Sequence, residues 1–317
     1  MHLLLCFFWV PQLNMPHDVA ESVYCYLARD WGLAKDELTV SKCEQLQTSI
    51  PDLRLAYQKN RAIAYHKPSV RRAYLAAFAP RYSYVLYRCL QKVRARALDV
   101  LQPWHRKEGV MCMLGGGPAC EIFGLLDWLY QNGIEPRYLH LVIMDREGYW
   151  RSFHSYLFSE LVSQHFRKTM VIPSYESVDF PIPTGVNFDR SLVNYSYAHA
   201  SLLGEARLIS IINCLSEISD HRGFKCHLRF LTQIAWEPQL VVCADSNAKK
   251  RRPRMSWLAE SFDGNPKLKS TELFEGTISM KFRWLERGQT SQRIFRKGKA
   301  PTWQSEIQRW AYIRQIG

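Results

Sequence analysis

The sequence lacks the patterns that mark disulfide-rich, zinc-binding and membrane-spanning chains. Its nine cysteines are scattered and never form a Cys-x-x-Cys pair, which favours buried free thiols in a reducing compartment over a zinc site. No uninterrupted apolar run reaches the roughly 18 residues of a membrane span. The apolar opening, residues 1–10, has no basic leader, so we expect it to pack rather than to act as a secretory signal. We therefore expect an intracellular protein without a metal or a membrane partner.

Acidic residues are scarce in one part of the chain, although the 317 residues carry a formal charge of +13. Between residues 51 and 107 only Asp52 and Asp99 oppose a long series of Lys and Arg. Tyrosines are interleaved with these cations, and rings can stack on unpaired bases while cations meet phosphates. This pattern predicts an RNA-handling surface. An ordinary helical layer is the alternative, with tyrosines packed inward and arginines facing water.

The candidate RNA-binding residues come from this region and from a second basic run at 249–254. That run could contact phosphate, act as a nuclear import signal in a eukaryotic host, or form a solvated loop. In a eukaryote the first two interpretations would place the protein in the nucleus or nucleolus, and otherwise we expect the cytoplasm. The candidates are Arg71, Arg72, Arg81, Lys249, Lys250, Arg251 and Arg252.

The distribution of apolar residues predicts two regions. Residues 12–100 are expected to be helical and to be punctuated by Pro51, Pro68 and Pro80, the last of which should kink or split a helix. From Gly109 the pattern alternates between strand and helix, which is typical of a parallel sheet with crossover helices. The sequence therefore predicts an N-terminal helical, basic and aromatic region over 1–107 and an α/β domain over 108–317.

A glycine turn is the most informative feature of the predicted sheet. The apolar strand 110–114 leads into Gly115, Gly116 and Gly117, and a helix is expected from Ala119. Glycines let a ligand approach the backbone, and the start of a helix offers unpaired N–H groups. Position 120 is Cys, where a dinucleotide fingerprint would have its third glycine. The next strand, 139–144, ends at Asp145. The alternative is a Rossmann-like domain that binds another nucleotide or none.

The string from Leu114 to Glu121, Leu-Gly-Gly-Gly-Pro-Ala-Cys-Glu, resembles motif I of class I S-adenosylmethionine-dependent methyltransferases. The common form of that motif is hydrophobic-Gly-x-Gly-Pro-Gly-x-Glu, and Ala119 is the departure. The resemblance implies a Rossmann-like sheet of parallel strands, closed by an antiparallel pair at 277–284 and 310–316. It also implies S-adenosylmethionine as cofactor, with Asp145 on its ribose. The implied cofactor-binding residues are Leu114, Gly115, Gly116, Gly117, Glu121, Asp145, Arg146 and Asn213.

Candidate catalytic residues follow the fourth predicted strand, where this family places groups that face the acceptor. Asn213 could hydrogen-bond a base edge or the donor, and Glu217 could accept a proton. Cys214 could add covalently to a pyrimidine ring as a thiolate. We favour a packing role for Cys214, because no second Cys or neighbouring Pro marks a nucleophile.

The basic stretch that begins at Arg71 and precedes the glycine turn is also similar to the family that includes fungal large-subunit ribosomal RNA uracil-N3 methyltransferases. That resemblance implies methylation of a base in a structured RNA, and the base must be unpaired or flipped out. Two alternatives stay open. One is a small-molecule methyltransferase in which helices 12–100 form a lid over a closed pocket. The other is a non-catalytic RNA-binding protein that has lost the donor site.

Overall fold

The described part of the computed structural model contains helices and a single seven-stranded sheet. Within the described part, no helix is both long enough and apolar enough to cross a membrane. The same residues hold no cluster of three or more metal-binding side chains. The described residues are 19–33, 40–58, 63–145, 148–163, 166–177, 200–212, 214, 224, 228, 231–232, 234–246, 272–280 and 307–316.

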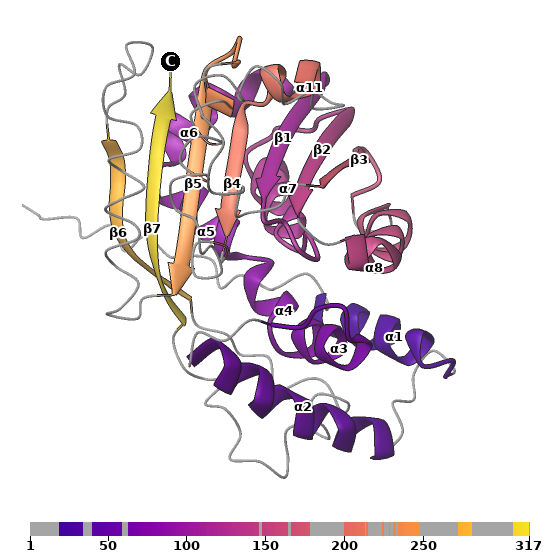
Figure 1. Ribbon diagram of the computed structural model, residues 1–317. Coiled ribbons are helices and arrows are strands. Elements are labelled where there is room, and N and C mark those ends of the chain that lie inside the picture. Colours follow the sequence, from indigo (N-terminus) through magenta and orange to yellow (C-terminus); the bar gives the residue numbers. More distant parts are fainter. Residues whose placement is uncertain are drawn as a thin grey trace, which may run out of the picture.

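The sheet has the strand order β3-β2-β1-β4-β5-β7-β6 (Figure 1). The first five strands in this order are parallel to one another, whereas β7 is antiparallel to both β5 and β6. This is a Rossmann-like α/β fold. The strands are β1 Glu108–Leu114, β2 Tyr138–Asp145, β3 Met170–Ser177, β4 Leu208–Ile212, β5 Gln239–Ser246, β6 Glu272–Met280 and β7 Ile307–Ile316.

The central strands are apolar on both faces, as expected when helices cover both sides of a parallel sheet. Along β1, Met111 and Met113 face one core, which they share with the helices that precede and follow the strand. Cys112 and Leu114 face the second core, which contains Leu203 of α11 (Ala200–Glu205). This alternation fixes the register of β1, because a slip of one residue would exchange its two faces.

The helices fall into two groups. Those before β1 are α1 Val19–Asp30, α2 Val40–Gln58, α3 Pro68–Ala77, α4 Ala79–Tyr82, α5 Val85–Lys92, α6 Arg94–Leu101 and the short η1 Gln102–Trp104. Within the sheet region are α7 Ile122–Gln131, η2 Gly148–Trp150, α8 Arg151–Tyr156 and η3 Leu157–Val162, a π-helix that continues α8. In Figure 1, α5 and α6 lie against the sheet, while α1–α4 lie below the carboxyl ends of β1, β4 and β5.

One buried core contains residues from both predicted regions. Leu86 and Leu101 lie in the same cluster as Met111 and Leu125, although the predicted boundary between regions falls at 107/108. That boundary stays a prediction.

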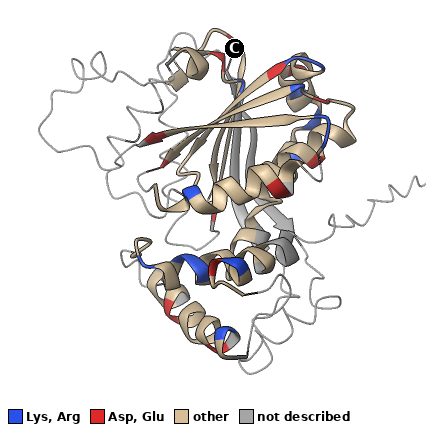
Figure 2. Ribbon diagram, turned by 90° about the vertical axis from the view of Figure 1, so that its right-hand side faces the viewer, with Lys and Arg blue, Asp and Glu red and all other residues tan. Residues whose placement is uncertain are grey.

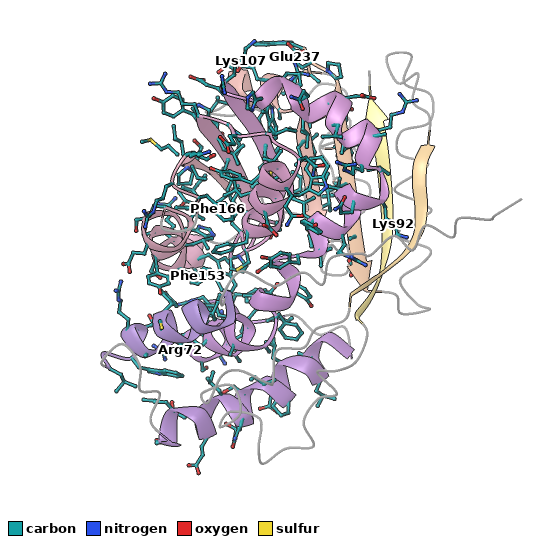
Figure 3. The ribbon with its side chains drawn as sticks, turned by 180° about the vertical axis from the view of Figure 1, so that it is seen from behind. Arg72, Lys92, Lys107, Phe153, Phe166 and Glu237 are labelled. Atoms are coloured by element: carbon teal, nitrogen blue, oxygen red, sulfur yellow. The ribbon has the colours of Figure 1, made fainter. Side chains whose placement is uncertain are left out.

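Figure 3 shows Lys107 and Glu237 together at the amino end of the sheet, and Phe153 and Arg72 toward the α1–α4 end. The amino ends of the parallel strands are therefore remote from helices α1–α4, which cover the carboxyl ends of these strands.

Several expected element boundaries differ from the structure. The helix predicted to stop before Pro51 continues through it as α2, which ends at Gln58. The prediction that Pro80 splits a helix is confirmed, because α3 ends at Ala77 and α4 begins at Ala79. β3 contains Pro173 and continues to Ser177, and this strand lies at the edge of the sheet, where proline is tolerated.

Candidate cofactor site

The glycine turn lies at the point where the strand order reverses. The chain steps from β1 to β2 and β3 on one side, and β4 and β5 extend the sheet on the other. Gly115 directly follows β1, and Cys214 follows β4. A Cβ on Gly115 would lie 2.2 Å from Sγ and 2.7 Å from Cβ of Cys214, so the two segments meet directly. Ligands of open α/β sheets bind at such a reversal, outside the carboxyl ends of the strands.

The three glycines have different roles. Gly115 and Gly117 have φ values of +63° and +46°, a backbone conformation that residues with a side chain rarely adopt. A Cβ on Gly116 would lie 2.9 Å from Cγ2 of Ile143, so this backbone packs tightly on β2. A Cβ on Gly117 would meet nothing closer than 4.0 Å. The turn is therefore closed at Gly115 and Gly116 and open to a ligand at Gly117.

Ala119 has the backbone conformation of the glycine that it replaces in the family motif. Its φ is +55°, and its backbone N–H donates to the carbonyl of Gly116 at 2.7 Å. The left-handed conformation costs an L-residue about 1–2 kcal/mol. The departure from the motif thus preserves the shape of the turn. The predicted helix start at Ala119 is wrong, because Ala119 belongs to this turn and α7 begins at Ile122.

Asp145 at the end of β2 contacts the turn, while its predicted contact with ribose stays a prediction. Its Oδ2 accepts a hydrogen bond from the backbone N–H of Gly117 at 2.8 Å. The carboxyl group also lies beside Glu121, whose side chain is buried at the start of α7. Burial, followed by the nearby charge of Asp145, raises the pKa of Glu121 to about 8. The buried carboxyl group of Glu121 therefore feels the charge of Asp145, which contacts the turn at Gly117.

Replacement of Glu121 by Gln should stabilise the protein at alkaline pH. The pKa of Glu121 rises from 4.5 to about 8 on folding. Folding favours the protonated form of Glu121. Its contribution to the free energy of unfolding is therefore fully present below about pH 4.5 and is lost as the pH rises from there to about 8. Glu121→Gln removes this loss, so its advantage should be small near pH 5 and reach a maximum, on the order of 5 kcal/mol, above pH 8. Urea unfolding from pH 5 to 9 measures this. An advantage of Glu121→Gln that did not change between pH 5 and pH 9 would contradict this prediction.

The described part contains one of the three candidate catalytic residues. Cys214 is buried, with 9% of its surface exposed, and its side chain occupies the space beside Gly115. This position agrees with the packing role that the sequence favoured. Asn213 and Glu217 lie outside the described residues, as does Arg146 among the cofactor-binding candidates. Leu114 is buried at the end of β1. The functional roles of all these residues stay predictions.

Two candidate RNA-binding arginines make contacts within the protein. Nη1 of Arg71 donates to the carbonyls of Tyr65 and His66, at 2.7 and 3.0 Å. Nε of Arg72 donates to Oδ2 of Asp30 at 2.6 Å and thereby ties α3 to α1. Both line a small cavity with Tyr149. Arg81 lies on α4, but its side chain is outside the described part, and Lys249, Lys250, Arg251 and Arg252 are outside it altogether.

The aromatic residues of the basic region pack largely inward, as the alternative interpretation of that region predicted. Tyr74, Tyr84 and Tyr87 are all less than 10% exposed. Tyr74 packs against Trp150 of η2, with ring centroids 5.4 Å apart. In Figure 2, Lys and Arg are spread over the lower helices and the upper loops and are interspersed with acidic residues. The described residues therefore do not gather the positive charge on the face seen there.

Sequence reasoning missed two residues that line the turn. Nε1 of Trp150 is 4.0 Å from the Cβ position of Gly117, and Nε2 of His154 is 2.7 Å from the Gly117 carbonyl oxygen. Neither residue belongs to a recognisable motif. The signal available was their place in the first helical turns after the acidic strand end, which lie near the glycine turn in this fold.

The comparisons with known proteins find a similar fold in solved structures but no matching family. No family model and no curated protein matches the chain. The precorrin-6y C5,15-methyltransferase of Geobacter metallireducens is similar over 72% of this chain and 89% of its own, at 11% identity and a TM-score of 0.35. The N-methyltransferase NodS of Bradyrhizobium japonicum, in complex with S-adenosylhomocysteine, matches 74% of this chain and 98% of its own, at 10% identity and a TM-score of 0.33. Such low scores carry no argument about substrate or mechanism.

Proposed function

We propose that the protein is an S-adenosylmethionine-dependent methyltransferase. One observation carries the proposal: the turn that matches motif I is open at Gly117, at the reversal of strand order, and is hydrogen-bonded there to Asp145. Ala119 supports it, because the one departure from the motif retains a positive φ. The motif and its backbone geometry therefore agree.

The residues present fit this cofactor. The bare backbone of Gly117 leaves space where a side chain would otherwise stand. A carboxylate has two oxygens and about four acceptor positions, so Asp145 can accept from ribose hydroxyls while it holds the Gly117 N–H. S-adenosylmethionine supplies an electrophilic methyl group on a sulfonium. The protein's part is to align donor and acceptor and to hold or remove a proton, for which Asn213 and Glu217 are the candidates.

Binding of S-adenosylmethionine to the purified protein is the direct test. Isothermal titration should show a single site for S-adenosylmethionine and for S-adenosylhomocysteine, and NAD should not compete with either. Asp145→Asn keeps the size of the side chain but removes its charge and half of its acceptors, so it should weaken binding by about tenfold or more. Absence of binding to the folded protein would refute the proposal and leave the non-catalytic alternative.

For the acceptor we propose a base in a structured RNA. The support is the charge of +13 and the near absence of acidic residues between 51 and 107. Methylation of uracil at N3, which the fungal family would imply, also requires removal of a proton from the pairing edge. No comparison links the chain to that family.

A small-molecule acceptor is the second candidate, and two observations favour it. Helices α1–α4 lie over the carboxyl ends of the strands, where a lid over a closed pocket would stand (Figure 1). The guanidinium groups of both candidate arginines donate hydrogen bonds within the protein. Arg71 donates to the carbonyls of Tyr65 and His66, and Arg72 donates to Asp30. These contacts reduce what the two arginines can offer to phosphates.

Salt dependence distinguishes the two acceptor classes. If RNA is the acceptor, labelled methyl groups should enter total RNA, and the affinity for RNA should fall steeply with salt. Replacing Lys249, Lys250, Arg251 and Arg252 by Ser should reduce the slope of log K against log salt by up to about four, roughly one for each lost phosphate contact. A folded protein that binds S-adenosylmethionine but shows no salt-dependent RNA binding would support the small-molecule class.

A further inference from the structure

His154 of α8 makes a specific contact with the turn. Its side chain is 3% exposed, and its Nε2 lies 2.7 Å from the carbonyl oxygen of Gly117. A carbonyl oxygen can only accept, so Nε2 carries the proton and donates. This hydrogen bond joins residues 37 positions apart and so connects α8 to the loop between β1 and α7.

The surroundings of the ring keep it neutral and in one tautomer. The ring stacks on Tyr175 of β3, with centroids 5.3 Å apart and an angle of 17° between planes, and Phe158 lies 5.9 Å away. Nδ1 is buried and has no hydrogen-bond partner among the described residues. A second proton would have no acceptor there, and burial lowers the pKa of His154 to about 4. The donor at Nε2 is therefore retained throughout the neutral range.

The peptide groups on the two sides of Gly117 are held by different elements. Its N–H donates to Asp145 at the end of β2, and its carbonyl accepts from His154 on α8. Gly117 has no side chain and a φ of +46°, so local sterics alone define its conformation weakly. These two hydrogen bonds hold the peptide groups on the two sides of Gly117 in their orientation.

We propose that His154 is a positioning residue for the methyl donor: by holding the Gly117 carbonyl it keeps the turn in its binding shape. This inference rests on the proposed function. Because His154 touches the turn and not the reacting atoms, its loss should raise the dissociation constant for the cofactor while the fold persists. An unpartnered buried nitrogen is unfavourable for a ring that only fills space, and a donor function for Nε2 accounts for a histidine here.

Three variants separate the donor from the ring. His154→Phe keeps the stack on Tyr175 without a donor, His154→Gln places an amide N–H near the position of Nε2, and His154→Asn has an amide too short to reach. The Phe and Asn variants should bind S-adenosylmethionine about tenfold more weakly, and the Gln variant should bind within about threefold of the parent. Tyr175→Phe, which keeps the ring under His154, is the control and should bind normally. Circular dichroism and thermal unfolding establish that each variant is folded.

Each outcome decides the inference. A folded Phe or Asn variant with parental affinity overturns it, and so does an equal loss in the Gln and Asn variants, which would assign the effect to the ring. Should the Phe variant not fold, the Gln and Asn pair is compared alone. If the parent protein binds no S-adenosylmethionine, the proposed function fails separately. Amide hydrogen exchange at Gly117 then tests whether the His154 hydrogen bond holds the turn. The protection of the Gly117 amide should fall in the Asn variant and persist in the Gln variant.

Discussion

Gly115→Ala is expected to abolish measurable binding of S-adenosylmethionine and to destabilise the protein. The new Cβ would lie 2.2 Å from Sγ of Cys214, and the backbone φ of +63° would add strain. The strain costs about 1–2 kcal/mol and the overlap about 1–3 kcal/mol, so the free energy of unfolding should fall by roughly 2–5 kcal/mol. Relief of the overlap would separate β1 from the segment after β4, at the reversal of strand order. Urea unfolding and isothermal titration measure the two effects.

Two further variants divide this effect into its parts. Gly133→Ala has nearly the same φ, +72°, but its Cβ would meet nothing within 4 Å, so it should show the strain alone. Cys214→Gly removes both atoms that lie within 3 Å of the new Cβ, and in the double variant with Gly115→Ala it should recover part of the stability. Equal destabilisation by Gly115→Ala and Gly133→Ala would show that Cys214 does not fill this space.

Gly124→Ala should have the largest effect on stability away from the turn. A Cβ there would lie 2.3 Å from the backbone carbonyl oxygen of Ser83, which also accepts the Gly124 N–H at 3.0 Å. Backbone cannot rotate aside as a side chain can, so α7 would have to move away from the segment between α4 and α5. The expected loss is roughly 3–5 kcal/mol, at the upper end for overpacking, because a hydrogen bond at the start of α7 is also broken.

The control for this variant is Gly148→Ala. Its Cβ would meet Nε of Arg151 at an ordinary 3.6 Å, so the change in stability should be within about 1 kcal/mol. Thermal unfolding of the two variants gives the comparison. A Gly124→Ala protein as stable as the parent would contradict the close crossing of α7 with the backbone at Ser83.

The predictable parts of the site are those encoded locally. The strand before Gly115, the glycine turn and Asp145 follow from short apolar runs and the residues that end them, and the structure brings them together. Pro51 shows where local rules fail. Proline normally breaks a helix, but α2 continues through it, with neighbours such as Leu46 and Leu53 buried in the core. Burial of the neighbouring apolar side chains can therefore outweigh the cost of a proline inside a helix.

The role of His154 could not be predicted, because it depends on contacts between distant segments. Nothing in residues 148–156 indicates that one imidazole will reach a carbonyl 37 positions earlier. The conformation of Ala119 is a similar case. Its positive φ is dictated by the turn around it, since alanine by itself prefers other regions. The sequence could therefore identify the turn but not the contacts that hold it.

The place of β7 in the sheet has a consequence for biosynthesis. In the described sheet β6 pairs only with β7, and β7 also covers the outer edge of β5. While the ribosome is still adding residues 281–306, β6 has been synthesised but its pairing partner has not, and β5 has an edge of unpaired backbone groups. The glycine turn, Asp145 and His154 have all been synthesised by then. The nascent chain can therefore assemble the glycine turn and its contacts early, and it is exposed to aggregation through β5 until residues 307–316 follow.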